Sequence, residues 1–232
     1  MHTEKFKGFV LQHFPISDSR SVVSLFTLAG GKRKAVFRAS KKQSKAYLSP
    51  LTELHFQLSG REHQELKTMS QVSLEAQNFD AATHYCGLTL LQHWAFLLDR
   101  SQPDEHEDER VYRLLRHALD SLPANPKPEQ LSARNLYFET WLLHFCGMLS
   151  RNPRLVNYGG QGDPSGDISP AVFHVLRQVF EQRIEDFAGN ALKLGSLAQA
   201  YKVLGRLWEQ FLNVEIKTGK LLLQQLNLRG TP

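Results

Sequence analysis

Alternating apolar and polar positions dominate the first third of the chain. Residues 6–11 begin one strand-like segment, and residues 21–28 form a second, rich in β-branched and aromatic side chains. Gly30 and Gly31 follow the second segment and suit a β-hairpin turn, because tight hairpin turns need positive φ. Three further strand-like segments begin at Lys34, Pro50 and Leu66. Five short strands within about 75 residues predict a small closed barrel such as an OB-fold.

The hydrophobic pattern changes to a helical period near residue 80. Helices are predicted over residues 83–99, 107–121 and 132–149, with Ser132 as the N-cap of the third. Ser169 and Pro170 have the residue types of a helix start. The last long helix carries an apolar stripe at 4-3-4-3 spacing, formed by Leu197, Tyr201, Leu204, Trp208 and Phe211. We therefore expect an α+β, multidomain chain, with the barrel over residues 1–78 and an all-α domain over residues 79–232.

Composition excludes several classes of protein. Of the 232 residues, 41% are hydrophobic and 10% are aromatic, which argues against a disordered chain. The sequence contains no run of 18 or more apolar residues, so no membrane span is predicted. Residues 1–14 lack the pattern of a secretory signal. The two cysteines, Cys86 and Cys146, make no disulfide framework and suit a reducing compartment. We therefore expect a cytoplasmic protein.

The net charge of +5 is concentrated near the N-terminus. Residues 1–80 hold 12 basic and 7 acidic side chains, whereas residues 81–232 hold 16 of each. Seven cations fall in one short segment without an intervening acid: Lys32, Arg33, Lys34, Arg38, Lys41, Lys42 and Lys45. This segment suits either a solubilising surface loop or a contact with a polyanion. The acidic run over residues 104–109 is interpreted as a solvated loop and helix start.

Motifs of catalysis and metal binding are absent from the sequence. It contains no G-x-x-x-x-G-K-[ST] or G-x-G-x-x-G phosphate loop, and neither G-x-S-x-G nor H-E-x-x-H. His144 and Cys146 lie two positions apart on a predicted helix, so they face different directions and do not chelate one ion. We expect no catalytic residue, no metal and no cofactor. A hydrolase or transferase would need a convergent set of polar side chains that the sequence does not display.

Several short motifs occur in an order and spacing that resemble one protein family. Residues 37–42, Phe-Arg-Ala-Ser-Lys-Lys, lead a strand into the basic segment, and residues 47–51 open the next strand. Residues 138–143, Phe-Glu-Thr-Trp-Leu-Leu, precede Gly147, and residues 212–220 resemble the family's C-terminal motif. In this combination the sequence resembles RecO, the bacterial recombination mediator.

Two positions depart from the family pattern. Many relatives carry a four-cysteine zinc site after the Phe-Glu helix, but residues 152–158 contain no cysteine here. The resemblance therefore implies the zinc-free type of helical domain. Ala39 stands where a glycine is common in the family, so the shape of the basic loop is not carried over from the resemblance.

The resemblance implies a non-enzymatic function in DNA repair. RecO-like proteins bind single- and double-stranded DNA, anneal complementary strands and assist RecA loading on strands coated by SSB, in the RecF pathway. Their partners are RecR and the acidic C-terminal tail of SSB. The resemblance also implies a bacterial, nucleoid-associated protein. The alternative is an OB-fold adaptor whose basic loop binds RNA or an acidic protein partner.

Strand alternation separates the side chains of the basic segment into two faces. Lys32, Lys34 and Arg38 share one face, while Phe37 faces the other way and is expected in the barrel core. Tyr47 suits either base stacking or packing. The predicted DNA-binding residues are Lys32, Arg33, Lys34, Arg38, Lys41, Lys42, Lys45 and Tyr47.

Overall fold

The structure is a computed structural model that describes residues 2–39, 45–61, 64, 66–152, 169–187 and 194–226. The chain forms two compact units. The first unit comprises Met1–Ala82 and Leu91–Tyr112, and the second comprises Thr83–Leu90 and Arg113–Pro232. Residues 91–112 therefore group with the N-terminal strands. The predicted domain boundary between residues 78 and 79 stays a prediction.

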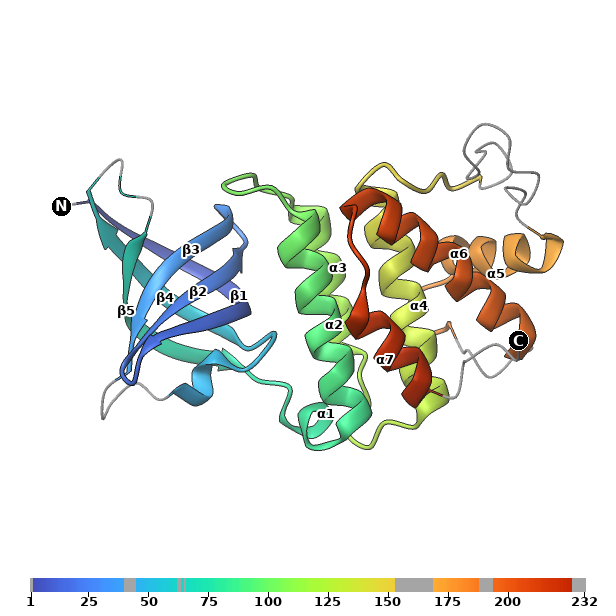
Figure 1. Ribbon diagram of the computed structural model, residues 1–232, viewed down its shortest axis with the longest axis horizontal. Coiled ribbons are helices and arrows are strands. Elements are labelled where there is room, and N and C mark those ends of the chain that lie inside the picture. The colour runs from blue at the N-terminus through green and yellow to red at the C-terminus, as the bar shows by residue number, and fades with distance from the viewer. Residues whose placement is uncertain are drawn as a thin grey trace. The chain divides into compact units, whose positions relative to one another are not determined.

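A closed five-stranded barrel occupies the first unit (Figure 1). Its strands are β1 (His2–Ser17), β2 (Arg20–Thr27), β3 (Gly31–Arg38), β4 (Glu53–Gly60) and β5 (Lys67–Ala76). They follow the order β1-β2-β3-β5-β4, with β3 and β5 parallel and every other neighbouring pair antiparallel. The long β1 closes the barrel, because one part of it pairs with β4 and the other with β2. The predicted OB-fold barrel is confirmed.

Apolar side chains from all five strands fill the barrel. On β3, Ala35 and Phe37 are completely or almost completely buried, so the expectation that Phe37 belongs to the core is confirmed. The 3-10 helix η1 (Lys45–Leu48) follows β3 and adds the buried Leu48 to the same core. Inward-facing residues alternate with outward-facing ones along β3, which leaves the outer face free to carry charge.

The β2–β3 hairpin depends on Gly31. Thr27 pairs with Gly31 across the turn, and Gly31 has φ of +62°, a conformation that side chains disfavour. A Cβ atom at this position would overlap the backbone carbonyl group of His106. The glycine therefore serves both the turn and the close approach of residue 106.

Helical residues pack against the barrel within the first unit. They come from α2 (Tyr85–Ser101) and the start of α3 (Glu109–Asp120), which α1 (Phe79–Thr83) precedes. The Tyr112 ring centroid lies 5.1 Å from that of Phe9 and 6.0 Å from that of Phe26. The Tyr112 hydroxyl donates a 2.7 Å hydrogen bond to the buried carboxylate of Glu53. These contacts fix the acidic loop between α2 and α3 close to the barrel.

The second unit is helical, with α4 (Pro128–Phe145) in contact with α5 (Pro170–Glu181) and α6 (Leu194–Leu212), and with α7 (Lys217–Gln225) following. The predicted apolar stripe of α6 is buried from Leu197 through Trp208. Tyr201 donates a 2.7 Å hydrogen bond to the Ser132 carbonyl oxygen. In the described part of the chain, no helix has the length and apolar character required to cross a membrane.

The two predicted helix caps have different outcomes. The expectation that Ser132 caps the third long helix is wrong, because α4 begins four residues earlier, with Lys127 as N-cap and Pro128 at the first helical position. Proline suits that position, since its missing N–H would have no helical partner there. At α5 the prediction is confirmed: the Ser169 hydroxyl accepts a 3.3 Å hydrogen bond from the Val172 backbone N–H.

Candidate nucleic-acid interface

The outer face of β2 and β3 carries the predicted cations in a defined register. Arg20 pairs with Arg38, Val22 with Val36, Ser24 with Lys34 and Phe26 with Lys32. The Phe26 and Ser24 end of this face is buried, whereas the Arg20 and Arg38 end is exposed. The availability of each cation therefore depends on its position along the strands.

Lys32 lies at the covered end of the face. Its side chain is only 12% exposed, and its Nζ donates a 2.7 Å hydrogen bond to the Asp99 carbonyl oxygen. The same Nζ lies 3.1 Å from a carboxylate oxygen of Asp104. The Lys32 carbonyl also accepts a 2.9 Å hydrogen bond from the Glu105 backbone N–H. Lys32 thus attaches β3 to the acidic loop.

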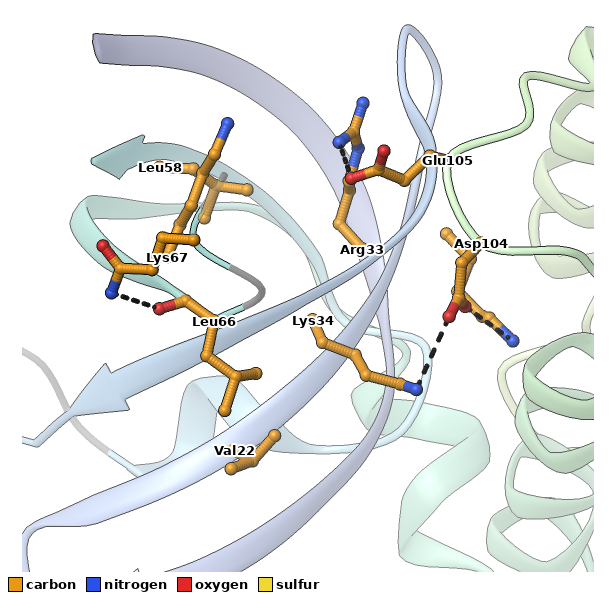
Figure 2. Close-up of a pocket in the computed structure, with 10 residues that line it drawn as sticks. Val22, Arg33, Lys34, Leu58, Leu66, Lys67, Asp104 and Glu105 are labelled. Atoms are coloured by element: carbon orange, nitrogen blue, oxygen red, sulfur yellow. Dashed lines mark hydrogen bonds and ion pairs between the residues drawn. The ribbon is translucent and has the colours of Figure 1, made fainter. Parts of the chain in front are cut away.

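Arg33 points to the other side of β3, as the alternation predicts. Its guanidinium lies over the Phe6 ring, 5.8 Å from the centroid, and donates a 2.8 Å hydrogen bond to the Gly30 carbonyl oxygen. It also forms an ion pair with Glu105 (Figure 2). Arg33 therefore projects from the opposite face of β3 to Lys34 and Arg38.

Lys34 remains half exposed, although its Nζ lies 3.6 Å from Asp104. Partial burial pushes the pKa of Asp104 upward, but hydrogen bonds and charge from Lys32 and Lys34 outweigh it and hold the pKa below its ordinary value. Asp104 is therefore ionised at neutral pH and forms ion pairs with both lysines. An exposed ion pair of this kind is weak, so a phosphate can compete with the carboxylate for Lys34.

Arg38 and Arg20 form an exposed cross-strand pair. Within the described part of the chain, neither arginine forms an ion pair. Arg38 was among the predicted residues, whereas Arg20 was missed because it lies outside the basic segment. Its contribution follows only from the register between β2 and β3, which the sequence pattern did not specify.

The remaining predicted residues lie in or after the loop that follows β3. Lys41 and Lys42 lie outside the described residues. Lys45 is exposed at the first position of η1. Tyr47 is partly buried and packs against the barrel core, a position that supports the packing alternative. Its role in base stacking stays a prediction.

A cavity of about 660 Å³ opens beside the cationic strand (Figure 2). Cationic, acidic and apolar side chains line it: Val22, Lys32, Arg33, Lys34, Leu58, Gln64, Leu66, Lys67, Asp104 and Glu105. Figure 2 shows Lys34 and Arg33 each joined to the acid that it contacts. This composition suits binding of an anion at the site where the chain's own carboxylates now lie.

The acidic run has a larger role than the predicted solvated loop and helix start. Asp108 matches that prediction, because its carboxylate accepts hydrogen bonds from the backbone N–H groups of Arg110 and Val111 at the start of α3. Asp104 and Glu105 instead pair with cations of β3. The signal for this pairing is complementary charge between two segments about 70 residues apart, which sequence periodicity does not detect.

Comparisons with known proteins agree with the fold. The model of a family described as "Recombination protein O N terminal" matches residues 1–78. "DNA repair protein RecO" of Koribacter versatilis is 29% identical over 169 residues, which cover 72% of this chain and 68% of the relative. The proteins of the same name from Pelobacter propionicus and Pseudoalteromonas atlantica are 30% and 31% identical, over 63% of this chain in each case.

These matches confirm the predicted resemblance to the RecO family. The alignments span 68%, 59% and 60% of the lengths of the three relatives. Among the described residues, no group of three or more His, Cys, Asp or Glu side chains is arranged to hold a metal ion.

Proposed function

We propose that this chain is a RecO-type protein, that it binds DNA through the outer face of β2 and β3, and that it acts as a recombination mediator in DNA repair. The names of the three relatives support a role in DNA repair. The observation that carries the proposal is the exposed pair of Arg20 and Arg38, which shares its face with Lys34.

Like charges directly opposite each other on neighbouring strands are destabilising. Arg20 and Arg38 occupy such a position, so the free barrel retains an unfavourable interaction. A phosphate between the two guanidinium groups removes the repulsion and gains charge-assisted hydrogen bonds. Displacing the counterions of the phosphates adds a favourable and strongly salt-dependent contribution.

Backbone contacts of this kind do not depend on sequence, and they leave base edges free to pair. We therefore infer that the chain binds both single and double strands and promotes annealing, because a cationic surface reduces repulsion between two phosphate backbones. The resemblance to the RecO family extends this proposal. We infer that the chain assists RecA loading on SSB-coated strands and that its partners are RecR and the acidic SSB tail. None of these steps needs a catalytic residue.

The proposal is tested by reversing the arginine pair. Arg20→Glu/Arg38→Glu keeps two like charges opposite each other, so the effect on barrel stability is expected to be small. Lys202→Glu/Arg206→Glu is the matched control, since it reverses one lysine and one arginine that are exposed on α6. Binding to a labelled single strand and to the matching duplex is measured by fluorescence anisotropy, with circular dichroism as the check of folding.

The arginine variant is expected to bind both forms at least about tenfold more weakly, because charge-assisted hydrogen bonds are worth about 1.5–3 kcal/mol each. The control is expected to change affinity much less. If about five phosphates contact the wild-type protein, its log–log salt slope on single strands is about −3.5. Equal losses in both variants would show that net charge alone drives binding, and absence of wild-type binding to either DNA would overturn the proposal.

A further inference from the structure

A row of apolar side chains crosses the outer face of the barrel. Phe14 on β1 is the register partner of Val22 on β2, and Val22 is the partner of Val36 on β3. Directly paired residues of antiparallel strands point to the same face of the sheet. The three side chains therefore lie side by side across three strands, a width of about 10 Å at the usual strand spacing.

The row is open to solvent at its β1 end. The Phe14 side chain is 58% exposed, and the neighbouring Ile16 is 59% exposed. A register irregularity between Pro15 and Ser17 leaves Ile16 outside the regular pairing of β1 with β2, close to the turn that joins these strands. Val22 and Val36 are partly buried, so the row forms a continuous surface and not a set of isolated side chains.

Cations border this row on both sides. The next outward-facing row, toward the turn that joins β1 to β2, holds Arg20 and Arg38, and the next outward-facing row on the other side holds Ser24 and Lys34. Successive outward-facing rows lie about 7 Å apart along a strand. An elongated anionic ligand with flat apolar groups matches this alternation of charge and apolar surface.

We propose that the Phe14–Val22–Val36 row binds unpaired bases of a single DNA strand, while Arg20, Arg38 and Lys34 hold its phosphates. This inference rests on the proposed function and deepens it by naming the substrate form that the face distinguishes. Aromatic rings accept every base by stacking, because each base has a π face. The aromatic platform is thus Phe14, whereas Tyr47 packs against the core.

The same geometry explains how a duplex is distinguished from a single strand. In a duplex each base face is covered by its neighbours, so Phe14 has no free face to stack on. The arginines reach phosphates in both forms. Loss of the Phe14 ring is therefore expected to affect single-strand binding selectively, and loss of the arginines is expected to affect both.

The test compares Phe14→Ala, Phe14→Leu and Phe14→Trp in the full chain. Phe14 is exposed, so these changes leave the barrel core intact. The Leu variant keeps apolar area without a ring, and the Trp variant keeps a ring. Tyr85→Ala is the control, because it removes another strongly exposed aromatic side chain, from the second unit. Affinity for a labelled oligothymidine and for a duplex of equal length is measured with each variant.

Phe14→Ala and Phe14→Leu are expected to bind oligothymidine roughly 5- to 150-fold more weakly, the range that corresponds to one base–aromatic stack, with duplex affinity unchanged. Phe14→Trp is expected to retain affinity, and its added indole fluorescence is expected to be quenched by the oligonucleotide.

Three results would overturn the inference: unchanged single-strand affinity in Phe14→Ala, full affinity in Phe14→Leu, or equal losses on single strand and duplex. Full affinity in Phe14→Leu would show that apolar contact with the oligonucleotide suffices and that aromatic stacking is not required. Wild-type binding to both DNA forms, together with insensitivity to Phe14, would reject this inference and leave the proposed function standing.

Discussion

Asp104→Asn isolates the competition between the chain's own carboxylate and DNA phosphate. In the free protein, Asp104 lies 3.1 Å from Lys32 Nζ and 3.6 Å from Lys34 Nζ. The substitution removes the negative charge and keeps the size of the side chain. Any phosphate that approaches this part of the face no longer has to displace a carboxylate.

The expected magnitude follows from the exposure of the pairs. The pair of Asp104 with Lys34 is exposed on both sides, 56% and 52%, so it belongs to the weak class worth about 0.2–1 kcal/mol. A phosphate that binds Lys34 would displace this pair, and Asp104→Asn is therefore expected to bind DNA about 1.4- to 5-fold more tightly. The gain should shrink as salt rises, because mobile ions screen exposed charges.

The assay is a fluorescence anisotropy titration at two salt concentrations, with urea unfolding to measure stability. Asp120→Asn is the matched control, since Asp120 is an exposed carboxylate paired with Arg116 and its loss changes net charge equally. Equal affinity gains in the two variants would refute the reasoning, because they would reflect net charge and not relief of the contacts to Lys32 and Lys34.

Three further predictions concern the fold that supports the face. Phe37→Ala is expected to lose about 3–5 kcal/mol of unfolding free energy in urea, because Phe37 is core, and an unchanged midpoint would contradict that assignment. Gly31→Ala is expected to destabilise the chain more than Gly147→Ala. Both glycines have positive φ, but only at Gly31 would the new Cβ atom meet backbone atoms, those of His106. Equal losses of stability in the two variants, measured by thermal unfolding, would argue against that contact. The pKa of Asp104 is lowered in the folded protein, so its ionised carboxylate is expected to stabilise the fold at pH values above its ordinary pKa of 3.8. This stabilisation is lost as the pH falls through the lowered pKa of the folded state. In urea unfolding at decreasing pH, wild type should therefore lose more stability than Asp104→Asn.

The barrel was predictable because its information is local. Period-two alternation marked each strand, and the inward position of Phe37 followed from the same alternation. Helix starts were less certain. The prediction that Ser169 is an N-cap is correct, whereas the same prediction for Ser132 is wrong. The helix that contains Ser132 begins earlier, at Pro128, which lies at the end of a proline-rich connector.

The arrangement of the face was not predictable, because it depends on register and on contacts distant in sequence. A count of charges treats Lys32 and Arg38 alike, yet the first lies against Asp99 and Asp104 and the second is exposed. Strand pairing brings Arg20 beside Arg38 and Phe14 beside Val22. A one-residue change of register would turn these side chains to other faces.

The salt dependence of single-strand binding is the most direct measurement of whether this outer face contacts the DNA backbone. Arg20→Gln/Arg38→Gln removes two charges without introducing acids. If each arginine contacts one phosphate, the log–log salt slope of this variant should be less steep than that of wild type by about 1.4. Parallel slopes for the two proteins would show that these arginines do not contact phosphate, in contradiction to the account given for the face.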